Sequence, residues 1–232
     1  MTKTPQNKNS SKIFVFSNLA TSLDGKIAPI DRGDCALGTP EDRLEMQRLR
    51  KRSDAVLFGA STLRVFKKFC GLRNSDKQPA NVVMSSTLKG ISPKFPFFSD
   101  PNRRRILLVG PDAPAQTMKK FDGLCEIYVL DRPTKKRSSA HQAIELLSQL
   151  GFKNLLVEGG GGIMWEFASH DLIDEYHITH TPKILGGITA PTLVDGPGLK
   201  CQEIVNLKLK RCKRVGDELY LTYVRTGRRG CP

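Results

Sequence analysis

Residues 155–162 read Leu-Leu-Val-Glu-Gly-Gly-Gly-Gly, an apolar run that enters four consecutive glycines. The apolar run predicts a buried strand, and the pattern of residues 163–169 predicts a helix after the glycines. Glycines let the backbone approach a ligand closely, and the N–H groups at a helix start bind phosphate. An ordinary tight turn is the alternative, but four glycines exceed what such a turn requires. The stretch therefore predicts a strand, a phosphate-binding turn and a helix.

Similar apolar runs recur along the chain before this stretch, and helical patterns separate them. Strands are expected at 13–20, 54–59, 80–84, 105–110 and 125–130, and helices at about 40–51 and 138–150. The first helix follows Thr39-Pro40, a capping hydroxyl and a proline at the first helical position, and the second stops at Gly151. Alternating strands and helices imply βαβ units and a largely parallel sheet.

The C-terminal third has a different pattern. A strand is expected at 174–181, and residues 205–215 and 218–225 are expected to form a hairpin across Gly216-Asp217. The sheet should therefore be mixed, with helices on its flanks and antiparallel strands at one edge. Residues 12–227 are expected to form a single domain, with a flexible polar tail at 1–11 and a short tail at 228–232.

The composition fits a folded protein with an anionic partner. Hydrophobic residues make up 39% of the chain, enough for a packed interior and too many for an intrinsically disordered protein. Lysine and arginine number 37 against 23 acidic residues, which gives a formal net charge of +14. This charge favours nucleic acid, phosphorylated metabolites or dinucleotides as partners. Nucleic acid is disfavoured because aromatic residues are only 7% and do not alternate with the basic clusters.

Membrane, disulfide and metal sites are not expected. No run approaches about 18 apolar residues, and the first residues lack the apolar stretch of a secretory signal, so a cytoplasmic location is expected. The 6 cysteines contain no Cys-x-x-Cys pair and are interpreted as reduced thiols. His177 and His180 would lie on opposite faces of a strand without a matching ligand set, so no metal is expected.

Three predicted strand ends carry candidate functional residues. Glu158 ends the strand before the glycines, where open α/β sheets bind their ligands. The segment from Asn18 to Lys26 runs from a strand into a turn, and Gly59 to Thr62 is expected to be a small-residue loop with two hydroxyls. Such ends would converge on one crevice. The glycines lack the Gly-x-Gly-x-x-Gly spacing and a Gly-Lys-Ser/Thr phosphate loop, which disfavours a Rossmann fold and nucleotide hydrolysis.

Four parts of the chain are notable for their order and spacing: Ser17–Ala28, Pro40–Arg50, Ser53–Thr62, and Glu158–Gly160 with Pro182, Gly186 and Gly187. Together they resemble the pyrimidine reductases of riboflavin biosynthesis. The resemblance implies a dihydrofolate-reductase-like fold, a homodimer, and reduction of a ribosylamino-pyrimidine phosphate with NADPH. That reductase is often fused to a zinc deaminase, whose His-x-Glu and Pro-Cys-x-x-Cys signature this sequence lacks, so a stand-alone reductase is expected.

The resemblance also assigns site residues. Arg50, Arg73 and Glu158 would hold the substrate, because guanidinium groups suit its phosphate and a carboxylate can accept hydrogen bonds from its pyrimidine. Glu158, Asn18 and Lys26 are the expected catalytic residues, with the last two near the reacting sugar. The NADPH contacts would come from strand ends and turns, with two serines serving the adenosine 2′-phosphate: Ala20, Gly59, Thr62, Ser85, Ser86, Gly160, Gly161, Gly162 and Ile163.

The expected reaction is hydride transfer from the nicotinamide to sugar C1′ of an open-chain imine, on either the diamino or the deaminated pyrimidine. The alternative is an NADPH-dependent, dihydrofolate-reductase-like enzyme with another pteridine-like substrate, which would not need Arg50 and Arg73. Two segments, Phe66–Lys68 and Cys35–Gly38, depart from the family pattern near the expected site.

Overall fold

The computed structural model of the protein describes residues 12–33, 35–134 and 136–226. The chain divides into two compact units, each built from two stretches of sequence. Among the described residues, unit 1 comprises 12–13 and 50–156, and unit 2 comprises 14–49 and 157–226. The expected tails at 1–11 and 228–232 lie outside the described residues, and the single domain at 12–227 stays a prediction.

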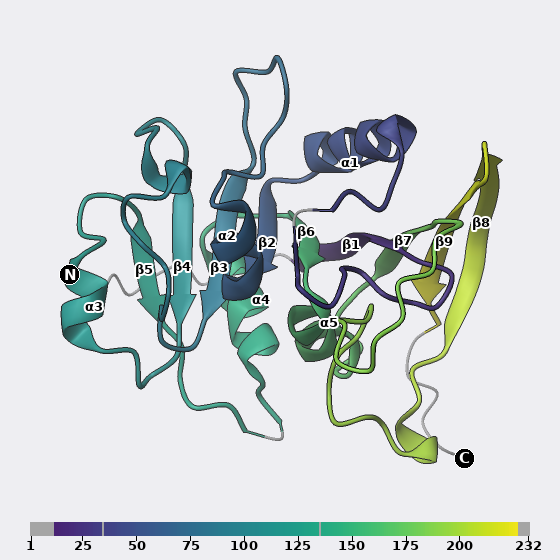
Figure 1. Ribbon diagram of the computed structural model, residues 1–232. Coiled ribbons are helices and arrows are strands. Elements are labelled where there is room, and N and C mark those ends of the chain that lie inside the picture. Colours follow the sequence, from purple (N-terminus) through teal and green to yellow (C-terminus); the bar gives the residue numbers. More distant parts are fainter. Residues whose placement is uncertain (1–11, 34, 135, 227–232) are drawn as a thin grey trace. The chain divides into compact units, whose positions relative to one another are not determined.

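Unit 1 is built on parallel strands. They are β2 (Ala55–Gly59), β3 (Ala80–Ser85), β4 (Arg105–Val109) and β5 (Glu126–Val129), in the spatial order β5-β4-β3-β2. Each neighbouring pair is parallel, and Figure 1 shows β3, β4 and β5 side by side in teal. Almost every residue of β2, β3 and β4 is buried, as expected for parallel strands covered on both faces.

Helices and turns connect these strands. α2 (Ala60–Phe66) follows β2, η1 (Pro96–Phe98) precedes β4, α3 (Ala115–Lys119) precedes β5, and α4 (Ser139–Gln149) follows β5. α4 begins after Ser138, whose hydroxyl accepts from the His141 N–H while the His141 ring accepts from the Ser138 N–H. Ala143 and Leu147 of α4 are buried, as their helical spacing predicts.

Unit 2 combines parallel and antiparallel strands. They are β1 (Phe14–Thr21), β7 (Glu175–His180), β9 (Glu218–Arg225) and β8 (Leu207–Val215), in the order β1-β7-β9-β8. β1 and β7 are parallel, whereas β7, β9 and β8 are antiparallel neighbours. Figure 1 shows β8 and β9 as the paired yellow arrows of the hairpin. Unit 2 also contains α5 (Gly161–Ala168) and η2 (Cys201–Glu203).

Two elements contain the boundaries between the units in the sequence. α1 (Pro40–Arg52) belongs to unit 2 up to Leu49, and β6 (Asn154–Gly159) belongs to unit 2 from Val157. Both were expected from the sequence, and Pro40 occupies the first position of α1.

The predicted fold class is confirmed: helices accompany mostly parallel strands, and an antiparallel hairpin lies at the C-terminal end. The expected loop at 59–62 is wrong, because α2 begins at Ala60. Leu63 is 1% exposed, so tertiary packing stabilises this seven-residue helix although its start has no side-chain cap. The first hairpin strand begins at Leu207, two residues later than expected.

No helix within the described residues is long and apolar enough to cross a membrane. The described cysteines, at 35, 70, 125, 201 and 212, are free thiols.

Candidate functional site

One face of unit 2 carries a row of polar side chains that crosses four strands. Asn18 on β1 pairs in register with His177 on β7, which pairs with Thr222 on β9, and Thr222 pairs with Arg211 on β8. Residues paired in this way lie on the same face of a sheet. The next row on this face consists of Ala20, Thr179, Tyr220 and Lys213.

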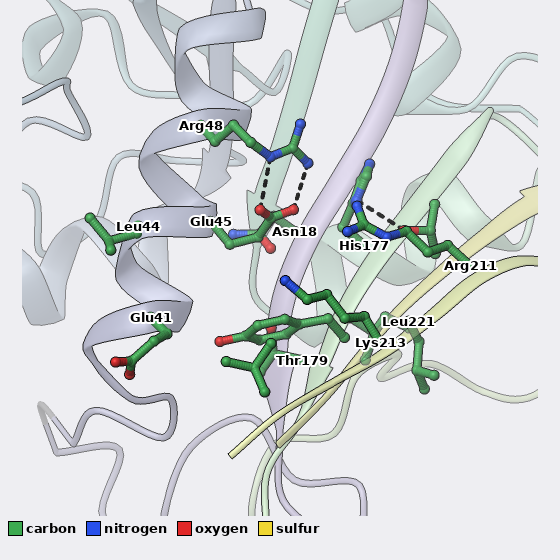
Figure 2. Close-up of a pocket in the computed structure, with 14 residues that line it drawn as sticks. Asn18, Glu41, Leu44, Glu45, Arg48, His177, Thr179, Arg211, Lys213 and Leu221 are labelled. Carbon is green, nitrogen blue, oxygen red and sulfur yellow. Dashed lines mark hydrogen bonds and ion pairs between the residues drawn. The ribbon is translucent and has the colours of Figure 1, made fainter. Parts of the chain in front are cut away.

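Apart from Ala20, the residues of these rows line a cavity of about 280 Å³ (Figure 2). Side chains of α1, among them Glu45 and Arg48, form another wall, and all of the lining residues belong to unit 2. Figure 2 shows Arg48 and Glu45 joined on α1, and Arg211 and Lys213 reaching in from the hairpin. The wall contains an amide, hydroxyls and charged groups, so the cavity suits a polar ligand.

On the α1 side of the cavity Arg48 is paired with Glu45, and Glu41 adds a second acid to that wall. Arg48 donates to Glu45 at 2.8 Å from Nε to Oε2 and at 2.5 Å from Nη2 to Oε1. This hydrogen bonding is the main cause of the lowered pKa of Glu45, and the charge of Arg211 contributes less. Because Glu45 neutralises Arg48, Arg211 and Lys213 are the cations that give the cavity its positive side.

A buried histidine and a buried carboxylate lie close together on β7, where His177 pairs in register with Asn18. His177 Nε2 is 2.8 Å from Oε1 of Glu175, and their side chains are only 8% and 9% exposed. Lys210 lies 3.3 Å from the other Glu175 oxygen, and the Thr222 hydroxyl lies 3.4 Å from His177 Nδ1. Buried polar side chains need such partners, so these contacts stabilise His177 and Glu175 in their positions. Among the described residues, no three His, Cys, Asp or Glu side chains group as metal ligands.

Two acids connect the start of α1 to the sheet: Glu218 on β9, and Asp42, which contacts Thr179 on β7. Glu218 accepts hydrogen bonds from the Thr39 N–H at 2.9 Å, the Thr39 hydroxyl at 2.8 Å and the Tyr220 hydroxyl at 3.0 Å. Burial raises the pKa of Asp42; the negative charge of Glu218 adds to this effect, while a hydrogen bond with Thr179 opposes it. Burial also raises the pKa of Tyr220 to about 12. These contacts fix the wall that α1 gives to the cavity.

The glycines between β6 and α5 differ in their surroundings. Gly160 precedes α5 with a φ of 77°, a conformation that favours glycine. A Cβ at Gly161 would lie 2.3 Å from a carboxylate oxygen of Asp195, whereas nothing lies within 4 Å of one at Gly162. Backbone N–H groups of the first helical turn have no partner within the helix. The open side of this helix start is therefore at Gly162, and a phosphate would have to approach there.

The turn after β1 is bound to a distant loop of unit 2. Asp24 accepts from the Ser22 hydroxyl at 2.7 Å, from the Leu185 N–H at 3.1 Å and from the Gly186 N–H at 2.7 Å. These bonds, led by that from Ser22, lower the pKa of Asp24 from 3.8 to about 2. The Lys26 ammonium donates to the Ala190 carbonyl at 3.1 Å, so it also fastens the turn.

The cofactor residues expected in unit 1 gather at one end of its strands. Gly59 ends β2 and pairs with Met84, so it lies beside Ser85 at the end of β3, and Thr62 lies in the first turn of α2. The Ser85 hydroxyl accepts from the Leu88 N–H at 3.0 Å and so shapes the turn. Ser86 is exposed, which leaves its hydroxyl as the better placed of the two for a ligand.

The substrate residues expected from the sequence fall into two places. Arg50 lies in the last turn of α1, where Nη1 donates to the Gly71 carbonyl at 3.2 Å, and Arg73 is exposed two residues beyond Gly71. Unit 1 thus brings the two arginines to one segment. Glu158 lies half-buried near the end of β6, in unit 2, close in sequence to the glycines.

Sequence reasoning missed most of the cavity. It considered His177 only as a metal ligand, and it gave the basic residues of β8 no role in a site. Their proximity to Asn18 depends on strand register, which joins residues far apart in the chain. The alternating pattern of the hairpin was the only available signal, and it shows which residues share a face but not their neighbours.

Solved structures with the same α/β fold are reductases of the RibD type. RibD of Acinetobacter baumannii matches with a TM-score of 0.73 and 18% identity, covering 93% of this chain and 58% of that one. A pyrimidine reductase-like protein of Corynebacterium diphtheriae matches with a TM-score of 0.72 and 18% identity, covering 92% of both chains. At these identities the likeness shows the fold alone.

Sequence comparison gives the family. The chain belongs to the RibD C-terminal domain family, whose model matches residues 13–221. It is 28% identical, over 222 residues, to the 2,5-diamino-6-ribosylamino-4(3H)-pyrimidinone 5′-phosphate reductase of Archaeoglobus fulgidus, covering 90% of this chain and 96% of that one. RibD of Bacillus amyloliquefaciens is 26% identical over 225 residues, which cover 91% of this chain and 57% of that protein. The resemblance found in the sequence is confirmed.

Proposed function

We propose that the protein is an NADPH-dependent reductase of riboflavin biosynthesis that converts a ribosylamino-pyrimidine 5′-phosphate to its ribitylamino form. The observation that carries the proposal is the match to relatives that are named as reductases, over nearly their whole length. The reductases of Archaeoglobus fulgidus and Methanothermobacter thermautotrophicus are matched over 96% and 99% of their lengths. Because both are named for the diamino pyrimidinone, we propose the diamino compound as the preferred substrate.

Each unit offers residues that suit a part of a nicotinamide dinucleotide. When bound, NADPH supplies the hydride that reduces sugar C1′. The helix start at Gly160, Gly161, Gly162 and Ile163 offers backbone N–H groups with open space at Gly162, which suits a diphosphate. In unit 1, Gly59 and Thr62 would contact the cofactor, and Ser86, with Ser85 shaping its turn, would serve a 2′-phosphate. Ala20 would contribute from β1.

The chain's own groups would bind and orient the substrate. Arg50 and Arg73 would hold the phosphate, since a guanidinium offers several donors in one plane. Glu158 would accept hydrogen bonds from the pyrimidine. Asn18, fixed in register beside buried His177, would present its amide to the sugar. Lys26 would act indirectly: its ammonium donates to the Ala190 carbonyl and so holds the turn after β1 against the loop that contains Gly186. Homodimer formation and a cytoplasmic location stay predictions.

NADPH oxidation by the purified protein tests this proposal directly. The diamino and the deaminated ribosylamino-pyrimidine 5′-phosphates are offered separately, and absorbance follows the cofactor. We expect turnover of the diamino compound at the higher kcat/KM. Turnover of a non-phosphorylated pteridine instead, with neither pyrimidine reduced, would replace this proposal by the dihydrofolate-reductase-like alternative.

The variant Glu158→Gln tests the division of roles between cofactor and substrate residues. It removes a charge but keeps the shape of the side chain, and we expect KM for the pyrimidine to rise about tenfold or more. The dissociation constant of NADPH should stay within about twofold of that of the wild type, because the nearby cofactor contacts are assigned to backbone N–H groups and not to the Glu158 side chain. Equal losses of both affinities would contradict the assignment of Glu158 to the substrate.

A further inference from the structure

Residues 69–73 of unit 1, here called the arginine segment, lie between α2 and β3 and end at Arg73. The segment belongs to no helix or strand, yet side chains hold its backbone at successive residues. Cys70 is held by Asn81: the Cys70 N–H donates to Oδ1 at 2.7 Å, and Nδ2 donates to the Cys70 carbonyl at 2.9 Å. A single amide thus occupies both backbone groups of one residue, as a neighbouring strand would.

Gln78 holds Leu72 in the same manner. The Leu72 N–H donates to Gln78 Oε1 at 2.7 Å, and Gln78 Nε2 donates to the Leu72 carbonyl at 3.0 Å and to the Ser75 carbonyl at 2.6 Å. Between these two anchors, Arg50 donates to the Gly71 carbonyl at 3.2 Å. Side chains therefore bind the backbone of residues 70–72. They come from Arg50 on α1, Asn81 on β3 and Gln78, two residues before β3.

Packing leaves the arginine segment little freedom. A Cβ on Gly71 would lie 2.5 Å from Gln78 Oε1 and 3.2 Å from the Phe69 ring. The Phe69 ring stacks on Phe97 with centroids 6.1 Å apart, and the Arg103 guanidinium lies 4.8 Å from the Phe69 centroid. The segment thus begins at half-buried Phe69, which stacks on buried Phe97, and it ends at exposed Arg73.

The position of Asn81 shows that this arrangement is specified by the sequence. Asn81 is fully buried on β3, where its neighbours Ala80, Val82 and Val83 are apolar. An amide buried among apolar side chains is strongly unfavourable unless its donors and acceptor find partners. Cys70 supplies both kinds of partner, so any other path of the segment would leave the Asn81 amide unsatisfied.

We propose that Gln78 and Asn81 are positioning residues. They hold the backbone of the arginine segment so that Arg73 and Arg50 can bind the phosphate group of a sugar phosphate. The inference rests on the proposed function, in which these arginines bind the substrate's 5′-phosphate. A guanidinium presents five N–H donors in one plane, which suits the several oxygens of a phosphate. Holding the backbone before binding reduces the conformational entropy that the complex must lose, which strengthens affinity.

Calorimetric titration with ribose 5-phosphate, and with ribose as the uncharged control, tests the inference without needing turnover. For Gln78→Ala we expect binding of ribose 5-phosphate to weaken between about threefold and tenfold. The matched control is Ser75→Ala, which removes the hydrogen bond from the Ser75 hydroxyl to the Lys77 carbonyl in the same loop. Its affinity should stay within about twofold of the wild type, because no bond to the arginine segment is lost.

A second variant and a second background keep the test decisive. Gln78→Asn keeps an amide but is too short to reach both Leu72 groups, so it should weaken binding like Gln78→Ala even if the alanine variant folds poorly. In the Arg73→Ala background, Gln78→Ala should cause no further loss, because the arginine that it positions is gone. Equal affinities for Gln78→Ala and Ser75→Ala, or no binding of ribose 5-phosphate by the wild type, would overturn the inference.

Turnover measurements separate this inference from the proposed function. With the phosphorylated pyrimidine, Gln78→Ala should raise KM and leave kcat and the NADPH dissociation constant unchanged, which a general loss of stability would not do. If the wild type binds ribose 5-phosphate and Gln78→Ala weakens that binding, but neither pyrimidine is reduced, the proposed function fails while the positioning role stands.

Discussion

Arg73 in unit 1 and Arg211 in unit 2 are both exposed arginines of a basic chain, but the backbone around them is held differently. Arg73 follows three residues whose backbone groups are bound by Asn81, Arg50 and Gln78. Arg211 follows an irregularity in the pairing of β8 with β9, on a strand at the edge of the sheet order. The same charge can therefore be placed for specific recognition or left on a solvated strand for general attraction of anions.

The two units also differ in the chemistry of their anchors. Neutral amides hold the arginine segment of unit 1, and amides do not titrate between acid and neutral pH. In unit 2 the turn after β1 is held by the Asp24 carboxylate, which can be protonated. The anchoring of the arginine segment in unit 1 should thus be insensitive to moderate acid, whereas the anchoring of the turn in unit 2 should depend on pH.

The variant Arg73→Ala should have the largest effect. If the held arginine binds the phosphate, its removal should lower kcat/KM for the phosphorylated pyrimidine between about tenfold and a hundredfold, the range for a charge-assisted hydrogen bond or two. Steady-state NADPH oxidation measures this change. The same variant should not alter kcat/KM for the dephosphorylated compound. An equal loss with both compounds would show that Arg73 does not recognise the phosphate, and Arg73 would then not differ from Arg211 in this role.

The glycines of unit 2 offer a matched pair of substitutions. Gly161→Ala should destabilise the protein by about 1–3 kcal/mol, because packing against Asp195 leaves no space for a methyl group. The methyl group of Gly162→Ala would enter open space, so the free energy of unfolding should stay the same or rise slightly. NADPH binding should weaken, because the methyl group occupies the space through which a phosphate would reach the helix start. Thermal unfolding and NADPH titration measure the two effects. Unchanged NADPH affinity in Gly162→Ala would argue against a diphosphate there.

Arg211→Ala and Lys213→Ala should change little. Both side chains lie on exposed β8, where water and salt screen their charges, so we expect losses in kcat/KM of less than about threefold at physiological salt. The measurement is repeated at low salt, where a modest effect should emerge. A loss as large as that of Arg73→Ala would instead assign the substrate phosphate to the cavity beside Asn18.

The smallest effect is the titration of Asp24. Its pKa is lowered to about 2, so the native state favours the ionised carboxylate; this stabilisation is complete above pH 3.8 and is lost as the pH falls toward about 2. The amide NMR shifts of Leu185 and Gly186 should report that midpoint. A midpoint near 3.8 would show that the three hydrogen bonds do not form in solution. The Leu72 amide, held by Gln78, should show no such titration.

The sequence predicts the elements of this fold better than their contacts. Apolar runs and capping signals located the strands, α1 and α4, because these depend on neighbouring residues. α2 was missed because its stability comes from the burial of Leu63 and not from a local cap. Asn81 lay within a correctly predicted strand, but its partner Cys70 is eleven residues away, and no local pattern indicates that contact.

The candidate site shows the same limit. The glycines after β6 and the arginines at 50 and 73 could be singled out from residue chemistry and resemblance. The pairing of Asn18 with His177 joins strands separated by most of the chain, so it depends on a register that the sequence does not state. The need for a glycine at position 161 likewise became clear only from the position of Asp195, whose carboxylate leaves no space for a Cβ there.

The central claim is that this reductase recognises its substrate's 5′-phosphate through the held arginine. The most direct measurement is kcat/KM of the wild type, Arg73→Ala and Arg211→Ala for the diamino ribosylamino-pyrimidine with and without its 5′-phosphate. We predict that the wild type and Arg211→Ala prefer the phosphorylated compound by about a hundredfold, and that Arg73→Ala loses most of that preference. Equal turnover of both compounds by the wild type, or a preference that survives in Arg73→Ala and vanishes in Arg211→Ala, would contradict the claim.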